Sequence, residues 1–544
     1  MSTANPHLSQ TSEAAPIGVI QRLRQRLGDS DRSTIVSATV VAYLFVASVA
    51  WAMITPIGGV PDEPAHITYA AAVVRGDLGA MAAVDHPVYA QLAVVTVPEW
   101  VASLTDPPRS VSDFPYPCYG GGETVTADCA PRLSASTTPS RVPTTVTRYP
   151  PPYYWIVGLP TLVMAGEPAV YAMRVVSAAL ATAMVALGLA AASRTRRTWL
   201  ALGAAVAFTP LVGHFAGSVN PTSIEITAAM GLGVGLMGIV GSERRNAILT
   251  SSLIVTLVFA LAWARPRTYL AMVAVIAAAT LVNVDELRDW LRNRAVRFTV
   301  LVGVAVATIT AFGYGRLFTH PEAVADVPQR VSDSILIQPT YGIVTNLHEL
   351  EQRFTGWSSD LIGRFGWLDH SPPGLVLIAW GGLALTLVLL AISYGRRRDR
   401  AALLTITIGA LFLAPLFIVS RVLNALTYQA RYHAPLALLI IIGATVALAR
   451  LPLERQRDRA WRILRLGAML APYAMLITVA ASLRRYGIGG EAQLLETLGQ
   501  VFETHTWLPP SGAQLVAGIS AVLMVTMAMI IKRTTTGGHR RCET

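Results

Sequence analysis

The sequence predicts an all-α polytopic membrane protein with about 12 transmembrane helices. Apolar residues make up 53% of the 544 residues, charged residues only 14%, and the mean hydropathy is +0.49. The apolar residues gather in runs of about 20, the length at which a helix crosses a bilayer. Soluble domains carry about a quarter charged residues, so this composition excludes a cytosolic globular enzyme and a disordered scaffold. The net charge of +11 lies in short clusters between the apolar runs, which indicates membrane topology and no nucleic-acid partner.

Each apolar run is an expected span. In chain order the expected spans cover residues 34–54, 168–192, 198–218, 222–240, 248–263, 268–282, 298–314, 374–394, 401–420, 433–449, 463–482 and 513–531. The chain then divides into a disordered cytoplasmic tail at 1–33, a first transmembrane segment at 34–56, a first outer loop at 57–167, a transmembrane bundle at 168–531 with outer loops near 315–373 and 484–511, and a cytoplasmic tail at 532–544.

The basic residues set the expected orientation. With a cytoplasmic N-terminus, the inner segments together hold about 27 of the 43 basic residues, as the positive-inside rule requires. Both termini then lie in the cytoplasm, and the chain is a multi-pass protein of the plasma membrane. The segment 151–166 is apolar, but it contains Pro160 and is shorter than a span, so we expect it to lie along the outer interface.

The first outer loop carries two further candidates. Tyr153 and Tyr154 suit the depth of the interface, where they would anchor a helix to lipid or stack on a sugar, and anchoring is the favoured interpretation. Cys118 and Cys129 both fall in this loop, where oxidation is chemically allowed. They are a candidate disulfide, with two unpaired thiols as the alternative.

The segment PDEPAH at 61–66 is the most informative for chemistry. Asp62 and Glu63 point to different sides of a helix or strand, and either can act as a general base at the membrane surface. His66 lies one helical turn after Asp62, near enough to orient it or pair with it. An ordinary polar loop with proline-fixed turns is the alternative, and the motif alone does not decide between the two.

Arginines expected at the outer face favour the functional interpretation. Arg265 and Arg267 flank Pro266 between two closely spaced spans, and Arg431 opens a later span, all against the positive-inside bias. Charges near the membrane core are costly and tend to be functional. Because a guanidinium fork matches phosphate oxygens, these three arginines are candidates for binding the phosphate of a lipid carrier. Snorkelling to outer headgroups is the alternative.

Other polar residues have weaker assignments. Arg174, in the second span, and Glu225, at the start of the fourth, are expected to form an ion pair or to line a polar cavity, and structural pairing is favoured. Asp369 and His370 form a further outer acid and histidine pair whose place relative to Asp62 is open. The sequence contains no zinc-ligand spacing, phosphate loop or dinucleotide fingerprint, so no cofactor is assigned and a divalent cation stays open.

Five segments together resemble a family of predicted membrane proteins, domain-of-unknown-function family 2142. They are PDEPAH at 61–66, YPPPYY at 149–154, SVNP at 218–221, RFGWLD at 364–369 and QARYHAPL at 429–436. Ala430 stands where the family pattern has glycine, and Thr222 stands where it commonly has an acidic residue. The family in turn is similar to the GT-C glycosyltransferases, which share many spans and a long first outer loop with interfacial helices.

The resemblance implies a reaction and a site. The donor would be a polyprenyl-phosphate-linked sugar, a hexose or a pentose, and the acceptor an envelope glycan or glycolipid. Asp62 would be the base, Glu63 would support it or bind the acceptor, and His66, Tyr153, Tyr154, Asp369 and Glu225 would support the site. Two other functions remain open: a transporter or flippase of lipid-linked glycan, and a non-catalytic scaffold for envelope assembly. Transporters usually show repeat symmetry, for which this sequence gives no sign.

Overall fold

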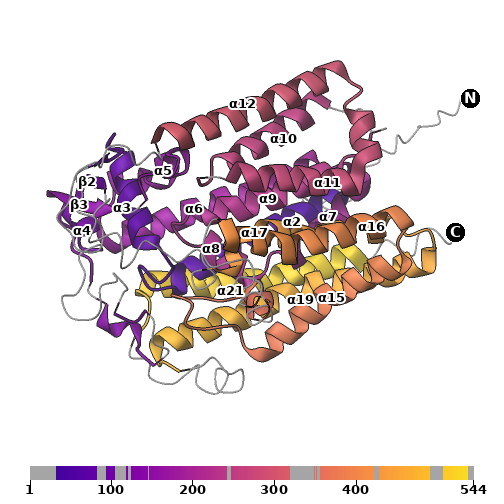
Figure 1. Ribbon diagram of the computed structural model, residues 1–544. Coiled ribbons are helices and arrows are strands. Elements are labelled where there is room, and N and C mark those ends of the chain that lie inside the picture. The colour runs from indigo at the N-terminus through magenta and orange to yellow at the C-terminus, as the bar shows by residue number, and fades with distance from the viewer. Residues whose placement is uncertain are drawn as a thin grey trace, which may run out of the picture.

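The computed structural model describes residues 32–81, 93–104, 118–120, 124–130, 132–144, 146–241, 247–266, 268–318, 348, 351, 356–421, 428–490 and 507–536. In this part of the chain, helices lie side by side in a bundle, and short helices with a small sheet cover one end of it (Figure 1). The expected tail at 1–31, the end of the C-terminal tail, much of the loops near 315–373 and 484–511, and Arg267 lie outside the described residues.

The bundle is built from helices that match the expected spans. They are α2 (Arg32–Ile54), α6 (Gly166–Ala191), α7 (Arg194–Ala207), α8 (Pro210–Ala216), α9 (Thr222–Gly238), α10 (Ala247–Ala262), α11 (Thr268–Trp290), α12 (Arg294–Phe318), α15 (Gly374–Tyr394), α16 (Arg397–Ile408), the π-helical turn η4 (Gly409–Leu413), α17 (Ala414–Arg421), α18 (Ala434–Ala449), α19 (Glu454–Gly487) and α21 (Ser511–Thr536).

Length and composition support most of the expected crossings. Eight of the described helices are long and apolar enough to span a membrane, and the pair α7 and α8, bent by 84°, makes nine if it is one span. Three shorter apolar helices, α9, α10 and α18, coincide with the remaining expected spans. The structure therefore confirms a mostly helical, multi-pass fold, while the count of twelve crossings stays a prediction.

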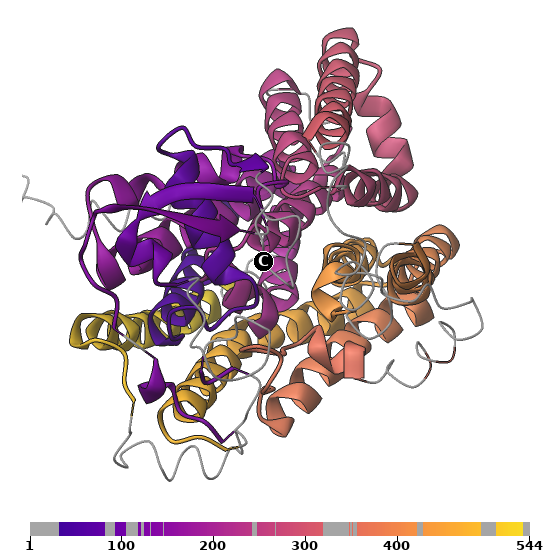
Figure 2. The same cartoon turned by 60° about the vertical axis from the view of Figure 1, so that its left-hand side comes forward.

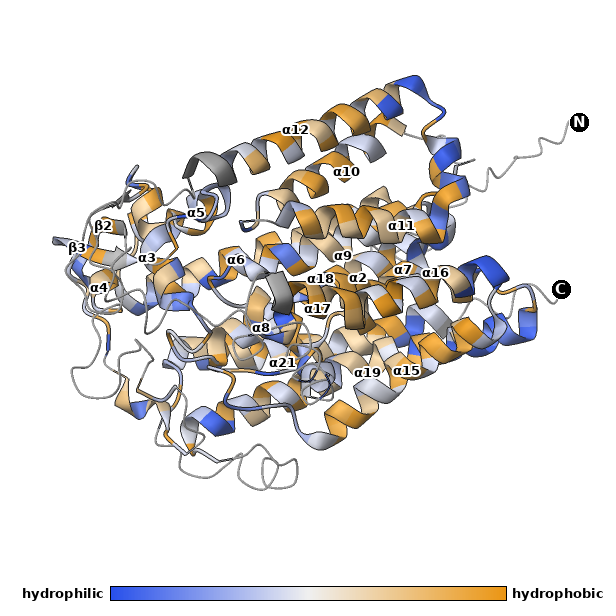
Figure 3. Ribbon diagram, in the orientation of Figure 1, coloured by the Kyte–Doolittle hydropathy of each residue, from blue (hydrophilic) through white to orange (hydrophobic). Residues whose placement is uncertain are grey.

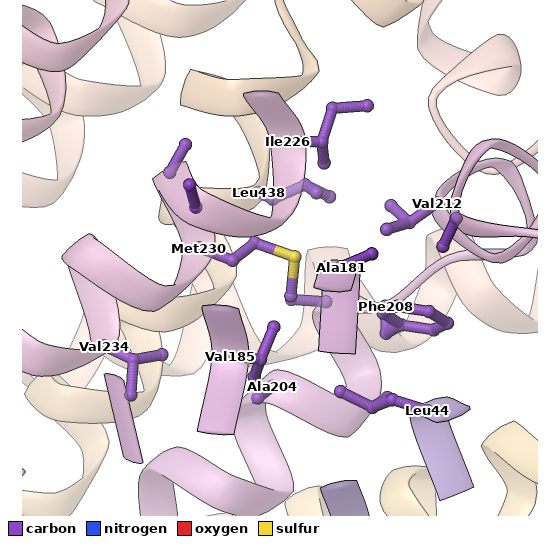
Figure 4. Packing of buried hydrophobic residues seen from close by; sticks show 14 of the residues in the cluster. Leu44, Ala181, Val185, Ala204, Phe208, Val212, Ile226, Met230, Val234 and Leu438 are labelled. Atoms are coloured by element: carbon purple, nitrogen blue, oxygen red, sulfur yellow. The ribbon is translucent and has the colours of Figure 1, made fainter. Parts of the chain in front are cut away.

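Helix α9 lies at the centre of the bundle. All of its residues are buried, and it packs against α6, α8, α10, α11 and α18. Figure 4 shows Met230 of α9 among Val185 of α6, Ala204 of α7 and Leu438 of α18. Because a helix that is apolar all round has no face for water, burial on every side is its stable arrangement.

Helices α6 and α9 approach each other at two glycines. A Cβ atom on Gly188 would lie 2.2 Å from the carbonyl oxygen of Gly231, and one on Gly231 would lie 2.2 Å from that of Met184. Small residues allow the close backbone contact that stabilises helix pairs in membranes. The crossing fixes the N-terminal halves of both helices, which carry Arg174 and Glu225.

The first loop forms a layer over one end of the bundle, which Figure 2 brings forward. Its elements are α3 (Glu63–Val73), β1 (Ala80–Met81), β2 (Ala93–Pro98), α4 (Glu99–Ala102), η1 (Ala127–Cys129), β3 (Pro139–Thr144), α5 (Pro152–Val157) and η2 (Leu159–Leu162), and the sheet is antiparallel in the order β1-β2-β3. The sheet is absent from the all-α expectation, because prolines in and around β3 conceal a strand pattern.

The segment α5–η2 presents apolar side chains outward. Its exposed large residues are Trp155, Ile156, Leu159, Leu162, Val163 and Met164. Tyr153 and Tyr154 point the other way and are buried in the protein. The apolar strip has the character of a surface that rests in lipid at the interface, and Trp155 is the aromatic residue placed to anchor it.

The opposite end of the bundle is hydrophilic, as the blue helix ends near both termini in Figure 3 show, and arginines lie among its residues. Arg196 donates to the carbonyl oxygens of Met237 and Ile239, and to Oδ1 of Asn283 at 2.8 Å. Asn283 breaks α11 with a non-helical backbone, and Arg450 donates to the same side chain. Arginine side chains therefore cap helix ends that would otherwise leave carbonyl groups unpaired.

We expect the α5–η2 strip to sit in lipid. A spin label at Val163→Cys, a position 84% exposed, should collide more with oxygen than with a water-soluble nickel reagent, because oxygen concentrates in the apolar phase. A label at Thr96→Cys, on the exposed face of β2, is the aqueous control, and Cys542→Ser removes the tail thiol in both proteins. Equal nickel accessibility at both positions would contradict lipid contact.

Candidate active site

The turn between α2 and α3 carries Asp62 in an unusual conformation. Asp62 precedes α3 with φ 67° and ψ −2°, in the left-handed region, and its side chain makes no capping bond to that helix. Aspartate is one of the few residues other than glycine that visits this region, at some cost in energy. The conformation turns the Asp62 side chain away from the helix it precedes, and 51% of that side chain is exposed.

Glu63, the next residue, has a different environment. Its side chain is fully buried, and both carboxylate oxygens accept from Arg174, Oε1 from Nε at 2.8 Å and Oε2 from Nη2 at 2.6 Å. The backbone amides of Gly58 and Val219 also donate to it. A carboxylate enclosed in this way holds the turn in place, which fits the expectation that Glu63 supports Asp62, and its acceptor-binding role stays a prediction.

Arg174 extends this clamp to the backbone of the turn. Its Nη1 donates to the carbonyl oxygens of Ala52 and Thr55, and its Nη2 to that of Pro56, at 2.6 to 3.0 Å. The expected pairing of Arg174 with Glu225 is therefore not what the structure shows. A bidentate guanidinium with further carbonyl partners is the geometry in which a buried ion pair repays its loss of hydration.

Three other segments hold the same turn. Asn220, in the SVNP segment, donates to the carbonyl oxygen of Pro61 at 3.0 Å. Trp367, in the RFGWLD segment, donates from Nε1 to that of Gly58 at 2.9 Å. The hydroxyl of Tyr119 donates to the backbone carbonyl oxygen of Ile57 at 2.5 Å. Residues far apart in the chain thus converge on the backbone that positions Asp62.

Arg431 faces Asp62 directly. Its Nη2 lies 3.0 Å from Oδ2 of Asp62, and its guanidinium stacks on the rings of Phe215 and Tyr432, with centroids 5.3 and 5.1 Å away. Only 5% of the Arg431 side chain is exposed, and its Nε and Nη1 have no hydrogen-bond partner among the described residues. Buried donors of this kind are costly when left unpaired, so they mark a place for an anion.

The ion pair sets the protonation state of Asp62. The partial loss of hydration at the half-exposed carboxyl favours the neutral acid, but the Arg431 guanidinium outweighs it and holds the pKa of Asp62 below its ordinary value. Burial lowers the pKa of His66 to about 3, and its Nδ1 lies 2.8 Å from the Tyr154 hydroxyl. At neutral pH the site therefore has an ionised Asp62 and a neutral His66 that is oriented by Tyr154.

A second arginine lies beside the first. Arg265, between α10 and α11, pairs with Oε2 of Glu225 at 3.0 Å, and its Nη2 donates to the Tyr149 hydroxyl at 3.3 Å. Its guanidinium lies 5.6 Å from the ring centroid of Tyr432, the ring on which Arg431 also stacks. The two arginines thus share one aromatic ring, and among the described residues each pairs with one carboxylate, Arg265 with Glu225 and Arg431 with Asp62.

Tyr153 and Asp369 lie outside this group. Tyr153 bonds Ser177 of α6 through its hydroxyl at 2.9 Å, which joins α5 to the bundle. Asp369 contacts His370 Nδ1 at 2.8 Å and Arg485 at 2.6 Å, and His370 Nε2 lies 3.1 Å from Ser482. The order of acid, imidazole and hydroxyl matches a catalytic triad, but all three side chains are buried and Ser482 lies inside α19, so we assign the group to structure.

The structure also identifies residues to which sequence analysis assigned no role. Tyr149 and Tyr432 lie in the YPPPYY and QARYHAPL segments, and their tyrosine-arginine contacts could have been suspected from those segments alone. Cys118 and Cys129 are joined in a disulfide, which confirms the candidate pairing over the alternative of two unpaired thiols. Among the described residues, no group of three or more His, Cys, Asp or Glu side chains could hold a metal ion.

A polar centre at one end of an apolar helical bundle defines a polytopic membrane protein with a buried acidic and basic site. Residues 45–440 match the family described as "Predicted membrane protein (DUF2142)", and the chain belongs to this family. The five segments that suggested the family from the sequence all contribute to the site. No curated protein matches the chain.

Two solved structures resemble the chain at low identity. Both are of ArnT from Cupriavidus metallidurans, one in the apo state and one bound to undecaprenyl phosphate. The identities are 16% and 14%, the TM-scores are 0.39 and 0.38, and each match covers 92% of this chain and 77% of the other. A likeness of this size establishes no activity for this chain.

The Glu63–Arg174 pair should carry much of the stability at this end. Glu63→Gln leaves a buried arginine without its counter-charge, which costs about 3 to 5 kcal/mol. Glu454→Gln, a matched change in an ion pair whose glutamate is 82% exposed, should cost less than about 1 kcal/mol. Thermal unfolding of the purified proteins in detergent compares the two, and equal midpoints would refute the structural role of Glu63.

Proposed function

We propose that this protein is a membrane glycosyltransferase that moves a sugar from a polyprenyl-phosphate donor to an envelope glycan or glycolipid on the outer face of the plasma membrane. The observation that carries the proposal is the half-exposed Asp62 beside the two unpaired, buried nitrogens of Arg431. A base and an anion-binding group at contact distance are the two parts that sugar transfer from a phosphate ester needs.

Asp62 is proposed as the general base. An acceptor hydroxyl attacks the anomeric carbon of the donor, its proton passes to a carboxylate oxygen of Asp62, and a new carbon–oxygen bond forms. The bond between the anomeric carbon and the phosphate oxygen breaks, and its electrons leave with the lipid phosphate. A single base suffices for such a displacement, which favours inversion at the anomeric carbon.

The arginines are proposed to hold the departing phosphate. Arg431 offers Nε and Nη1, and Arg265 lies on the same tyrosine ring with a side chain 17% exposed. Guanidinium groups fixed by stacking and ion pairs need little rearrangement as negative charge develops on the leaving oxygen. Arg267 is proposed as a further phosphate ligand from the sequence alone. His66 and Tyr154 support the backbone and ring positions around Asp62.

The donor reaches the site from the lipid phase in this proposal. The α5–η2 strip keeps the first loop at the interface, and the arginines lie at the outer ends of their helices, where a lipid phosphate would be found. The orientation with both termini in the cytoplasm follows from the positive-inside rule. The hydrogen bond between Arg32 and the backbone of Thr534 shows that α2 begins where α21 ends, on one side of the bundle.

Replacing Asp62 should separate chemistry from binding. Asp62→Asn should lower the rate of transfer from a radiolabelled polyprenyl-phosphate sugar about 10²- to 10⁴-fold, because the base is gone. The same variant should bind polyprenyl phosphate at least as tightly as wild type, because Arg431 loses the carboxylate that competes for it. Asp289→Asn, in an exposed ion pair with Arg292 at the end of α11 opposite to Arg265, is the control.

The outcomes divide the candidate functions. Wild-type transfer by folded, inserted Asp62→Asn would exclude Asp62 as the base. Loss of lipid-linked glycan movement without any sugar transfer would indicate a transporter. No effect of the substitution on either process would indicate a scaffold.

Removing Arg431 should change both donor binding and the pH profile. Arg431→Gln should weaken polyprenyl-phosphate binding about 10- to 100-fold, the worth of a charged hydrogen bond. Asp62 works as a base only when ionised, and Arg431 keeps its pKa low. The acid limb of kcat/KM should therefore lie below the ordinary range of an aspartate in wild type and move to higher pH in Arg431→Gln. An unmoved limb would contradict the coupling of the two residues.

A further inference from the structure

The loop closed by the Cys118–Cys129 disulfide touches the turn that carries Asp62. Tyr119 follows Cys118 in the chain, and its hydroxyl donates to the carbonyl oxygen of Ile57 at 2.5 Å. The Tyr119 side chain is buried, so this bond is shielded from water. The loop is thus joined to the backbone five residues before the proposed base.

The same loop is fixed on its other side to α19. Arg485 donates from Nη1 to the carbonyl oxygen of Val125 at 2.7 Å and from Nη2 to that of Tyr119 at 3.2 Å. The rings of Tyr119 and Tyr486 meet edge to face with centroids 6.0 Å apart, and Ala127 is buried in the same cluster. The disulfide and these contacts hold the described residues of the loop, and they fix the position of the Tyr119 hydroxyl.

A parallel route joins Arg485 to the same turn. Nη2 of Arg485 also donates to Asp369 in the RFGWLD segment. Trp367, two residues before Asp369, donates to the carbonyl oxygen of Gly58. Ile57 and Gly58 are adjacent, so the two routes hold neighbouring carbonyl groups. Gly58 has φ +78°, which glycine adopts freely, whereas Asp62 at φ +67° has a conformation that costs energy for a residue with a Cβ atom and persists only when its surroundings hold it.

From these contacts we infer that Tyr119, fixed by the Cys118–Cys129 disulfide and Arg485, is a positioning residue that keeps Asp62 in line with Arg431. Tyr119 acts through the backbone from Ile57 to Asp62 and touches neither substrate nor Arg431. The effect expected on sugar transfer rests on the proposed function. The coupling between Tyr119 and the backbone at Asp62 does not, and it can be measured without any reaction.

Hydrogen exchange of the full-length protein in lipid nanodiscs tests the coupling directly. Tyr119→Phe removes only the hydroxyl, and should speed exchange about 2- to 10-fold in peptides covering residues 57–67, whose amides of Gly59, Glu63 and His66 bond within the turn. The double variant Cys118→Ser with Cys129→Ser should act in the same direction.

Tyr486→Phe is the matched control, because the Tyr486 hydroxyl is buried and has no hydrogen-bond partner in the described part of the chain. It should leave exchange in these peptides unchanged. Equal exchange in wild type, Tyr119→Phe and Tyr486→Phe would overturn the inference.

Kinetics distinguish positioning from general destabilisation. Tyr119→Phe should lower kcat for sugar transfer about 2- to 10-fold while KM for the donor does not rise, because both arginines are untouched. The acid limb should also move to higher pH as Asp62 loses register with Arg431. Faster exchange without sugar transfer by any variant would refute the proposed reaction and leave the coupling intact. If Tyr119→Phe transfers sugar with the wild-type kcat and with the acid limb of its pH profile at the wild-type position, the positioning role is refuted.

Discussion

The buried ion pair between Glu63 and Arg174 is the constraint on which the site depends. Removing two charges from water costs several kcal/mol each, and the cost is met only when geometry and additional hydrogen bonds are favourable. Here both carboxylate oxygens and most guanidinium nitrogens are satisfied, partly by carbonyl groups of the turn itself. The pair therefore cannot rearrange without also releasing the backbone that leads to Asp62. The adjacent carboxylates therefore have different environments: that of Glu63 is enclosed by the protein, and that of Asp62 is accessible.

The bundle makes this clamp rigid. The glycine contact between α6 and α9 sets the position of Arg174 relative to the SVNP segment, whose Val219 amide and Asn220 side chain both reach the PDEPAH turn. The bend between α7 and α8 brings Phe215 beneath Arg431. Because these contacts come from separate helices, a displacement of any one of them would alter the distance between Asp62 and Arg431. Packing in the apolar part of the protein thus determines the geometry of the charged groups at one end of the bundle.

Much of the fold could be predicted from hydropathy, since every expected span falls on a helix or bent pair. The sites were harder, because a sequence shows residue types but not partners. Arg174 and Glu225 were expected to pair, yet each found another partner, Glu63 and Arg265. Tyr153 and Tyr154 look interfacial by composition but are buried, and Trp155 faces outward instead. The left-handed backbone of Asp62, which separates it from Glu63, has no sequence signal beyond the tolerance of aspartate for that conformation.

The charge balance of the site bears on how the proposed base would work. Asp62 and Glu225 each neutralise one arginine, so the group is close to neutral before donor binds, and a neutral group is cheaper to bury than two free cations. A donor phosphate that takes the free nitrogens of Arg431 adds negative charge beside Asp62. A nearby like charge increases the affinity of a carboxylate for a proton. In the proposed reaction, donor binding would therefore convert Asp62 from a weak base held by Arg431 into a stronger one, so that the acceptor is activated only when the sugar is in place.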